Sequence, residues 1–126
     1  MILDLAPDWK MEVDRGPDWV FIRLHGKEPF DTDGIELSNR LARVLEQEFS
    51  HRLVLELDDI RVMNSHFVAE LVTLHKQLHD RGGLLRISGL SDENYSVLCA
   101  SKLGDRFPQY HTREDAVMGY RPAKPR

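Results

Sequence analysis

The sequence has 126 residues, of which 41% are hydrophobic, and these values favour one globular domain and argue against intrinsic disorder. Its 17 Lys and Arg residues against 21 Asp and Glu residues give a net charge of −4. This balance argues against nucleic acid as the main partner, because phosphate backbones attract a basic surface.

Two segments near the N-terminus alternate as the strands of a β-hairpin do. Hydrophobic side chains occupy every second position: Trp9, Met11 and Val13 in the first segment, and Val20, Ile22 and Leu24 in the second. Residues 15–18 contain a glycine and a proline, which predicts the turn between the strands. Trp9 and Trp19 are expected to pack against the sheet, and an exposed aromatic platform for a ligand is the alternative.

Beyond the hairpin, helical and strand-like segments alternate. Asp33 and Glu36 form a capping-box-like helix start. Residues 53–57 form a dense apolar run, which is typical of a strand covered on both faces. Residues 84–88 predict the next strand, and residues 107–110 could add a short last one.

Capping residues and glycines predict three further helices. The first begins at Asn64 or Ser65, both of which are good N-cap residues, and ends at Gly82. The next is expected within residues 91–104, from a serine cap to a glycine stop, and the last within residues 112–118.

This order predicts an α/β domain whose mixed sheet has four to five strands, with about four helices packed mainly on one face. The domain is expected to occupy residues 1–118, followed by a flexible basic tail at residues 119–126. No apolar stretch approaches the roughly 18 residues of a membrane span. The N-terminus also lacks the pattern of a secretory signal, so we expect a soluble cytoplasmic protein.

Sequence signatures of enzymes are missing. The chain has no phosphate-binding loop, dinucleotide-binding glycine pattern or Gly-x-Ser-x-Gly nucleophile elbow, so no catalytic residue and no cofactor is predicted. His75 and His79 stand four residues apart and could share a metal, but no third ligand with suitable spacing accompanies them. Cys99 is the single cysteine, which excludes an internal disulfide, and it is expected to be a core thiol.

Asp58 and Asp59 follow the apolar strand at residues 53–57. They could act as paired carboxylates, but a solvated strand end is the favoured interpretation because no partner base accompanies them. No metal site is predicted there.

The junction at residues 62–67 places a hydroxyl group at the start of a helix, directly after a strand and its loop. Free backbone N–H groups and the positive end of the helix dipole stabilise an anionic group at such a position. Spacing alone makes Ser65 the N-cap. A phosphate on Ser65 would be tolerated there and would add close to two negative charges to the surface.

Five segments carry a family resemblance: Leu53-Val54-Leu55-Glu56-Leu57-Asp58, Met63-Asn64-Ser65, Leu74-His75-Lys76-Gln77-Leu78 with Arg81-Gly82-Gly83, Leu85-Arg86-Ile87-Ser88-Gly89-Leu90-Ser91, and Leu98 to Gly104 with Phe107-Pro108. On these segments, the chain from about Trp9 to Val117 resembles the STAS domain. That domain is the fold of bacterial anti-sigma factor antagonists and is also found at the cytoplasmic end of sulphate transporters.

In that family, the strand-to-helix junction carries Asp-Ser followed by a small hydroxyl residue and glycine. An anti-sigma factor that is also a kinase phosphorylates this serine, and phosphorylation releases the antagonist from it. The resemblance places Ser65 at the phosphorylated position. Asn64 replaces the aspartate, His66 the small hydroxyl residue and Phe67 the glycine. His66 and Phe67 are expected to add bulk where a kinase approaches.

The resemblance therefore implies a protein-binding switch rather than an enzyme, docking through Asn64, Ser65, His66 and Phe67, with Ser65 as the control point. The expected partner is an anti-sigma factor or a serine kinase of the histidine-kinase-like type, with no direct nucleic-acid or membrane partner, and a homodimer is left open. One alternative is a scaffold or assembly subunit that is never phosphorylated. Another is a small-ligand or enzymatic domain that uses its histidines.

Overall fold

A computed structural model describes residues 1–6, 8–26 and 36–119. Its elements in chain order are β1 (Ile2–Ala6), β2 (Trp9–Arg15), β3 (Val20–Gly26), α1 (Leu37–Gln47), β4 (Arg52–Glu56), α2 (Ser65–Asp80), β5 (Leu84–Ser88), α3 (Asp92–Ala100) and α4 (Arg113–Met118). The expected helix cap at Asp33 and residues 120–126 of the expected tail lie outside the described residues.

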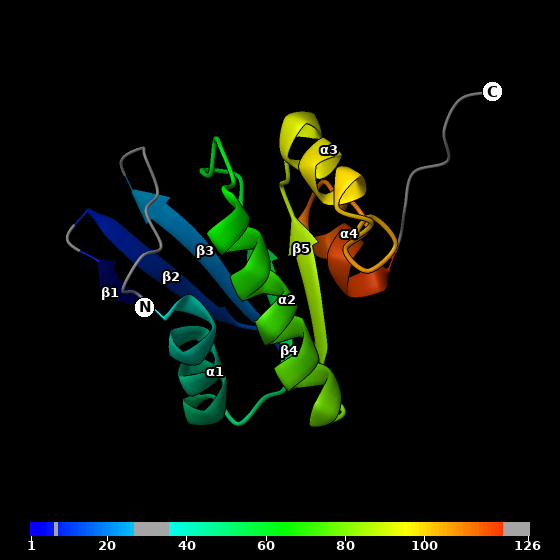
Figure 1. Ribbon diagram of the computed structural model, residues 1–126. Helices are drawn as coiled ribbons and strands as arrows, with labels where there is room; N and C mark the ends of the chain where they lie inside the picture. The colour runs from blue at the N-terminus through cyan, green and yellow to red at the C-terminus, as the bar shows by residue number, and fades with distance from the viewer. Residues whose placement is uncertain (7, 27–35, 120–126) are drawn as a thin grey trace.

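The strands form one mixed sheet in the order β1-β2-β3-β4-β5 (Figure 1). The pairs β1–β2 and β2–β3 are antiparallel, and the pairs β3–β4 and β4–β5 are parallel. The predicted α/β class, the hairpin and the mixed sheet are therefore confirmed. Strand β1 was not predicted; it is a short edge strand whose Leu5 is buried while Ile2 is 64% exposed.

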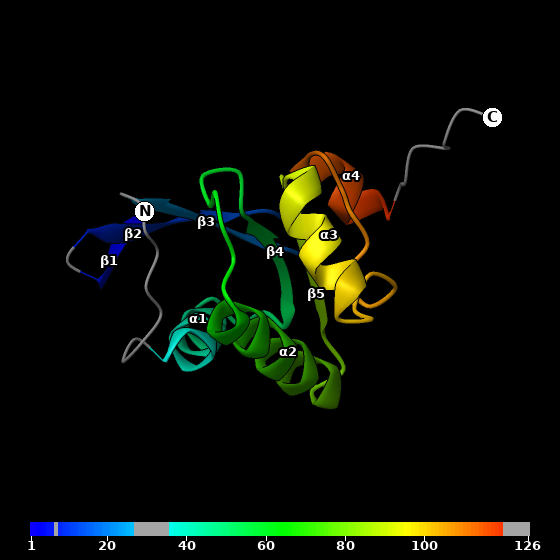
Figure 2. The ribbon, with the colours of Figure 1, turned by 45° about the horizontal axis from the view of Figure 1, so that its top comes forward.

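Both faces of the sheet are covered around β4, as the dense apolar run predicted. Successive side chains of a strand point to opposite faces. Leu53 and Leu55 belong to the main core under α1 and α2, whereas Val54 belongs to a second cluster with Tyr110 and Ala116. Figure 2 shows α1 and α2 on one side of the sheet and α4 on the other. Helices α1, α2 and α3 contribute side chains to the main core, the last through Leu98, and the shortest helix, α4, lies on the opposite face.

Helix α2 buries one continuous stripe against the sheet. Its buried residues are Phe67, Val68, Leu71, Leu74 and Leu78. The spacing of three and four residues puts them on one side of the helix. Full burial of such a side chain is worth about 1.5–3 kcal/mol, so this stripe fixes how α2 lies on the sheet.

Two local predictions need correction. Helix α3 ends at Ala100 rather than at Gly104, because Lys102 takes the left-handed conformation (φ 61°) that usually falls to glycine. The next N–H, that of Leu103, donates to the carbonyl of Leu98 at 2.8 Å and closes the helix. Residues 107–110 form no strand, and Tyr110 makes an isolated bridge to Ser88.

In the described part of the chain, no helix is long and apolar enough to cross a membrane.

Candidate functional site

Asn64 caps the start of α2. Its backbone is extended (φ −88°, ψ 173°), and its side-chain Oδ1 accepts a hydrogen bond from the backbone N–H of Phe67 at 2.8 Å. Ser65 is therefore the first helical residue and not the cap that spacing predicted. Its side chain is exposed, and its hydroxyl makes no hydrogen bond with any residue that the structure describes.

The four expected docking residues divide into a surface group and a core residue. Asn64, Ser65 and His66 are exposed, whereas Phe67 is 1% exposed and belongs to the main core. The expectation that Phe67 adds bulk at the surface is thus wrong, since the first turn of α2 directs its side chain under the helix. Exposed residues of the preceding loop extend the surface group. We call Arg61, Val62, Asn64, Ser65 and His66 the junction surface.

The loop that leads into α2 is tied to strand β3 by two ionic contacts. Asp58 Oδ1 lies 3.4 Å from Arg23 Nη2, and Asp59 Oδ2 lies 2.6 Å from His25 Nδ1. Asp58 and Asp59 are exposed, as the solvated interpretation expected, and they also anchor the loop, a role that the sequence did not indicate.

His25 bridges two carboxylates. Its Nε2 lies 2.6 Å from Glu12 Oε2, and its Nδ1 lies 2.6 Å from Asp59 Oδ2. Ionised carboxylates only accept hydrogen bonds, so both ring nitrogens donate and the ring is cationic in this arrangement. Burial alone would lower the pKa of His25, but the hydrogen bonds to Glu12 and Asp59 outweigh it and raise the pKa above its ordinary value.

A buried carboxylate joins the sheet to α4. Glu56 is 4% exposed, and it accepts hydrogen bonds from Arg23 at 3.2 Å and from Arg113 at the start of α4. Arg113 also pairs with Asp14 at 3.2 Å and lies over the ring of Phe21. The sequence signal for this cluster is the single charge of Glu56 inside the apolar run at residues 53–57, and the cluster was not predicted from it.

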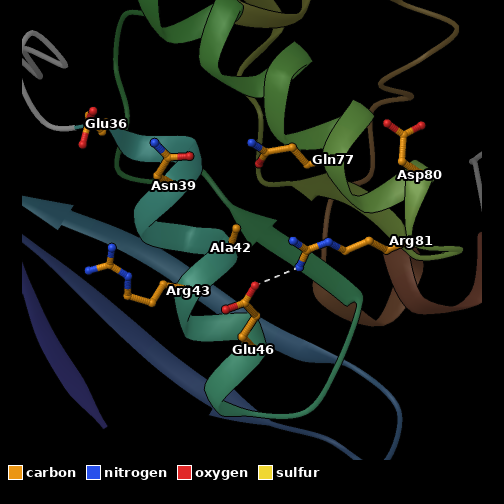
Figure 3. A pocket seen from close by; sticks show the side chains of 8 residues that line it. All are labelled: Glu36, Asn39, Ala42, Arg43, Glu46, Gln77, Asp80 and Arg81. Atoms are coloured by element: carbon orange, nitrogen blue, oxygen red, sulfur yellow. Dashed lines mark hydrogen bonds and ion pairs between the residues drawn. The ribbon is translucent and has the colours of Figure 1, made fainter.

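An open groove of about 440 Å³ lies between α1 and the C-terminal half of α2 (Figure 3). Acidic and basic side chains line it together, and an ion pair of 2.9 Å between Glu46 and Arg81 crosses it. Its α2 residues begin at Gln77, twelve positions beyond Ser65, or about 18 Å along the helix. The groove is therefore separate from the junction surface.

The two histidines of α2 stack on each other with ring centroids 6.3 Å apart, and His75 also meets the edge of Phe107. Burial, then Arg106 and His79, lower the pKa of His75. No group of three or more metal-ligating side chains gathers anywhere in the described residues.

Cys99 is exposed, so the prediction that it is a core thiol is wrong. Trp9 and Trp19 are buried, as predicted.

Comparison with protein families matches residues 11–116 to the model of the STAS domain. A comparison with curated proteins finds no significant match. Solved structures share the fold at low sequence identity. An anti-sigma factor antagonist from Mycobacterium paratuberculosis has a TM-score of 0.71 and 19% identity, over 93% of this chain and 98% of that one.

Two further structures give the same result. An anti-sigma-factor antagonist (STAS) domain protein from Planctomyces limnophilus has a TM-score of 0.66 and 18% identity, over 86% of this chain and 96% of that one. The Bacillus cell fate determinant SpoIIAA in its phosphorylated form has a TM-score of 0.64 and 19% identity, over 88% of this chain and 99% of that one. With its five-stranded mixed sheet, its helices and the family match over most of its length, this chain belongs to the STAS domain family.

Proposed function

We propose that this chain is a protein-binding switch of the anti-sigma factor antagonist kind. It docks an anti-sigma factor or a serine kinase of the histidine-kinase-like type through the junction surface, and phosphorylation of Ser65 releases the partner. We place this role in the cytoplasm and assign no catalytic activity to the chain.

The main support for the proposal is that the cap of α2 and the candidate modification site are different residues, Asn64 and Ser65. Asn64 supplies the cap, so the exposed hydroxyl of Ser65 has no hydrogen bond to the described part of the chain that modification would break. A phosphate there would lie at a helix N-terminus, where backbone N–H groups and the helix dipole favour an anion. The fold can therefore carry the modification.

The same phosphate would change the surface strongly. It adds about −1.5 to −2 charges at neutral pH. The junction surface otherwise carries Arg61, a histidine and uncharged side chains. A partner that buries this surface would have to desolvate the new charge, which disfavours the complex. The existence of a solved phosphorylated form of SpoIIAA, which shares this fold, supports the proposal.

One feature favours a scaffold as the second candidate. Asn64 keeps the capping geometry but lacks the negative charge of an aspartate, and the exposed His66 occupies space beside the acceptor hydroxyl. Both differences change the surface that a kinase must recognise. A scaffold would use the same surface without modification.

Site mapping separates the two candidates. The protein purified from its native host would be analysed by phosphopeptide mass spectrometry in growing and stressed cells, with a Ser65→Ala strain as the control. A phosphopeptide that includes Ser65 and vanishes in the control strain supports the switch. Full absence of phosphate from Ser65 in all conditions, with equal phenotypes of Ser65→Ala and Ser65→Glu strains, supports the scaffold.

A further inference from the structure

The loop between β4 and α2 presents two exposed residues between two buried ones. Ile60 and Met63 are 2% and 4% exposed, whereas Arg61 and Val62 between them are exposed. The loop thus dips into the core on either side of a surface excursion. Buried backbone N–H and C=O groups need hydrogen-bond partners, because an unpaired one loses its hydration without compensation.

One side chain from another element supplies partners on both sides of this excursion. Asn94 of α3 accepts a hydrogen bond from the N–H of Met63 through Oδ1 at 3.2 Å. Its Nδ2 donates to the carbonyl of Ile60 at 3.0 Å. A donor faces one end of the amide and an acceptor faces the other, so the orientation of the group is fixed by its surroundings.

Asn94 is itself held firmly. It is 2% exposed, its backbone N–H donates to the capping oxygen of Ser91 at 3.1 Å, and it lies four residues before the fully buried Leu98 on the same face of α3. The amide is therefore attached to a packed helix, and it can fix the position of the loop that it contacts.

We propose that Asn94 is a positioning residue, whose buried amide clamps the loop at Ile60 and Met63 and thereby sets the junction surface in its partner-binding form. This inference rests on the proposed function of that surface. Met63 directly precedes the cap Asn64, so a shift of the clamped backbone moves Asn64 and Ser65 with it. Arg61 and Val62, which lie between the two clamped residues, move as well.

The test compares Asn94→Ala with Asn39→Ala, which removes an exposed asparagine from α1. Amide hydrogen exchange by NMR is the first readout and needs no partner. We expect exchange at Met63 to rise about tenfold in Asn94→Ala, as loss of one buried hydrogen bond allows, with the amides of β4 unchanged. Unchanged exchange at Met63, or an equal rise throughout the sheet, would overturn the clamp.

Two further readouts test the clamp. If Asn94→Ala does not fold, the wild-type protein decides: the Met63 amide must exchange at least about tenfold more slowly than the exposed Val62 amide, and equal rates contradict the clamp. The second readout is affinity for the anti-sigma factor or kinase that the wild-type protein captures from its native host. We expect Asn94→Ala to weaken it about tenfold at unchanged α-helical content, and Asn39→Ala to leave it unchanged. A wild-type protein that binds no such regulator refutes the proposed function, whereas the exchange data still decide the clamp.

Discussion

The Oδ1 atom of Asn64 accepts a hydrogen bond of 2.8 Å from the backbone N–H of Phe67, so the cap of helix α2 lies one residue before the hydroxyl that spacing predicted as the cap. Phe67 turns under the helix into the core, while Ser65 stays at the surface. The cap and the candidate modification site are therefore different residues. Each can be changed separately, which makes the account testable residue by residue.

Asn64→Ala removes the cap of α2. We expect the free energy of unfolding to fall by about 0.5–2 kcal/mol, the usual cost of losing an N-cap side chain. Asn64→Asp keeps an acceptor oxygen and adds a negative charge at the helix N-terminus, so its stability should equal or exceed that of the wild type. Urea unfolding followed by circular dichroism measures both. An Asn64→Ala variant as stable as Asn64→Asp would refute the capping role.

Glu56→Ala leaves two guanidinium groups without their shared buried carboxylate. Breaking one side of a buried ion pair typically costs about 3–5 kcal/mol, and we expect a loss near the lower end because Arg23 and Arg113 are each about one-third exposed. The exposed pair of Glu46 with Arg81 offers a matched control: Glu46→Ala should cost less than about 1 kcal/mol. Equal losses in the two variants, measured by urea unfolding, would contradict this assignment.

The stabilising contribution of His25 depends on pH. Its pKa is raised in the folded state relative to the ordinary value of 6.5. A raised pKa means that the folded state binds the proton more tightly, so this stability is fully present below pH 6.5. It is lost as the pH rises through the folded-state pKa.

The difference in unfolding free energy between wild type and His25→Gln isolates this effect. We expect the difference to be largest below pH 6.5 and to shrink as the pH rises through the raised folded-state pKa of His25. The lowered pKa of His75 acts in the opposite sense, costing stability as the pH falls below 6.5, but it is present in both proteins and cancels. Parallel pH profiles of the two proteins would show that His25 contributes nothing through its charge.

Much of the fold could be predicted because its elements carry strong local patterns. The hairpin strands alternate, β4 has an apolar centre at residues 53–55, and Ser91 and Thr112 cap α3 and α4. The edge strand β1 was missed because five residues with one buried leucine give little periodicity. The end of α3 was missed because Lys102 takes a backbone conformation usually reserved for glycine.

The site was predictable in its location and less so in its parts. The junction of strand and helix was found from the hydroxyl and the cap residues. Contacts from other elements were not predicted. His25 of β3 reaches Asp59, and Asn94 of α3 reaches Ile60, each across 34 residues of sequence. A polar residue such as Asn94, four positions before a core leucine, is the signal in the sequence that could have indicated a buried role.

The most direct test of the account is quantitative capture of partners from the native host with four baits: wild type, Ser65→Ala, Ser65→Glu and Ser101→Glu. Ser101 is an exposed serine at the end of α3, so its variant controls for added charge alone. We predict that wild type, Ser65→Ala and Ser101→Glu capture one protein with a histidine-kinase-like ATPase domain. We predict at least about tenfold depletion on Ser65→Glu, because a charge buried at an interface without a partner costs more than the roughly 1.4 kcal/mol of a tenfold change. Equal capture of that protein by the folded Ser65→Glu bait would contradict the switch.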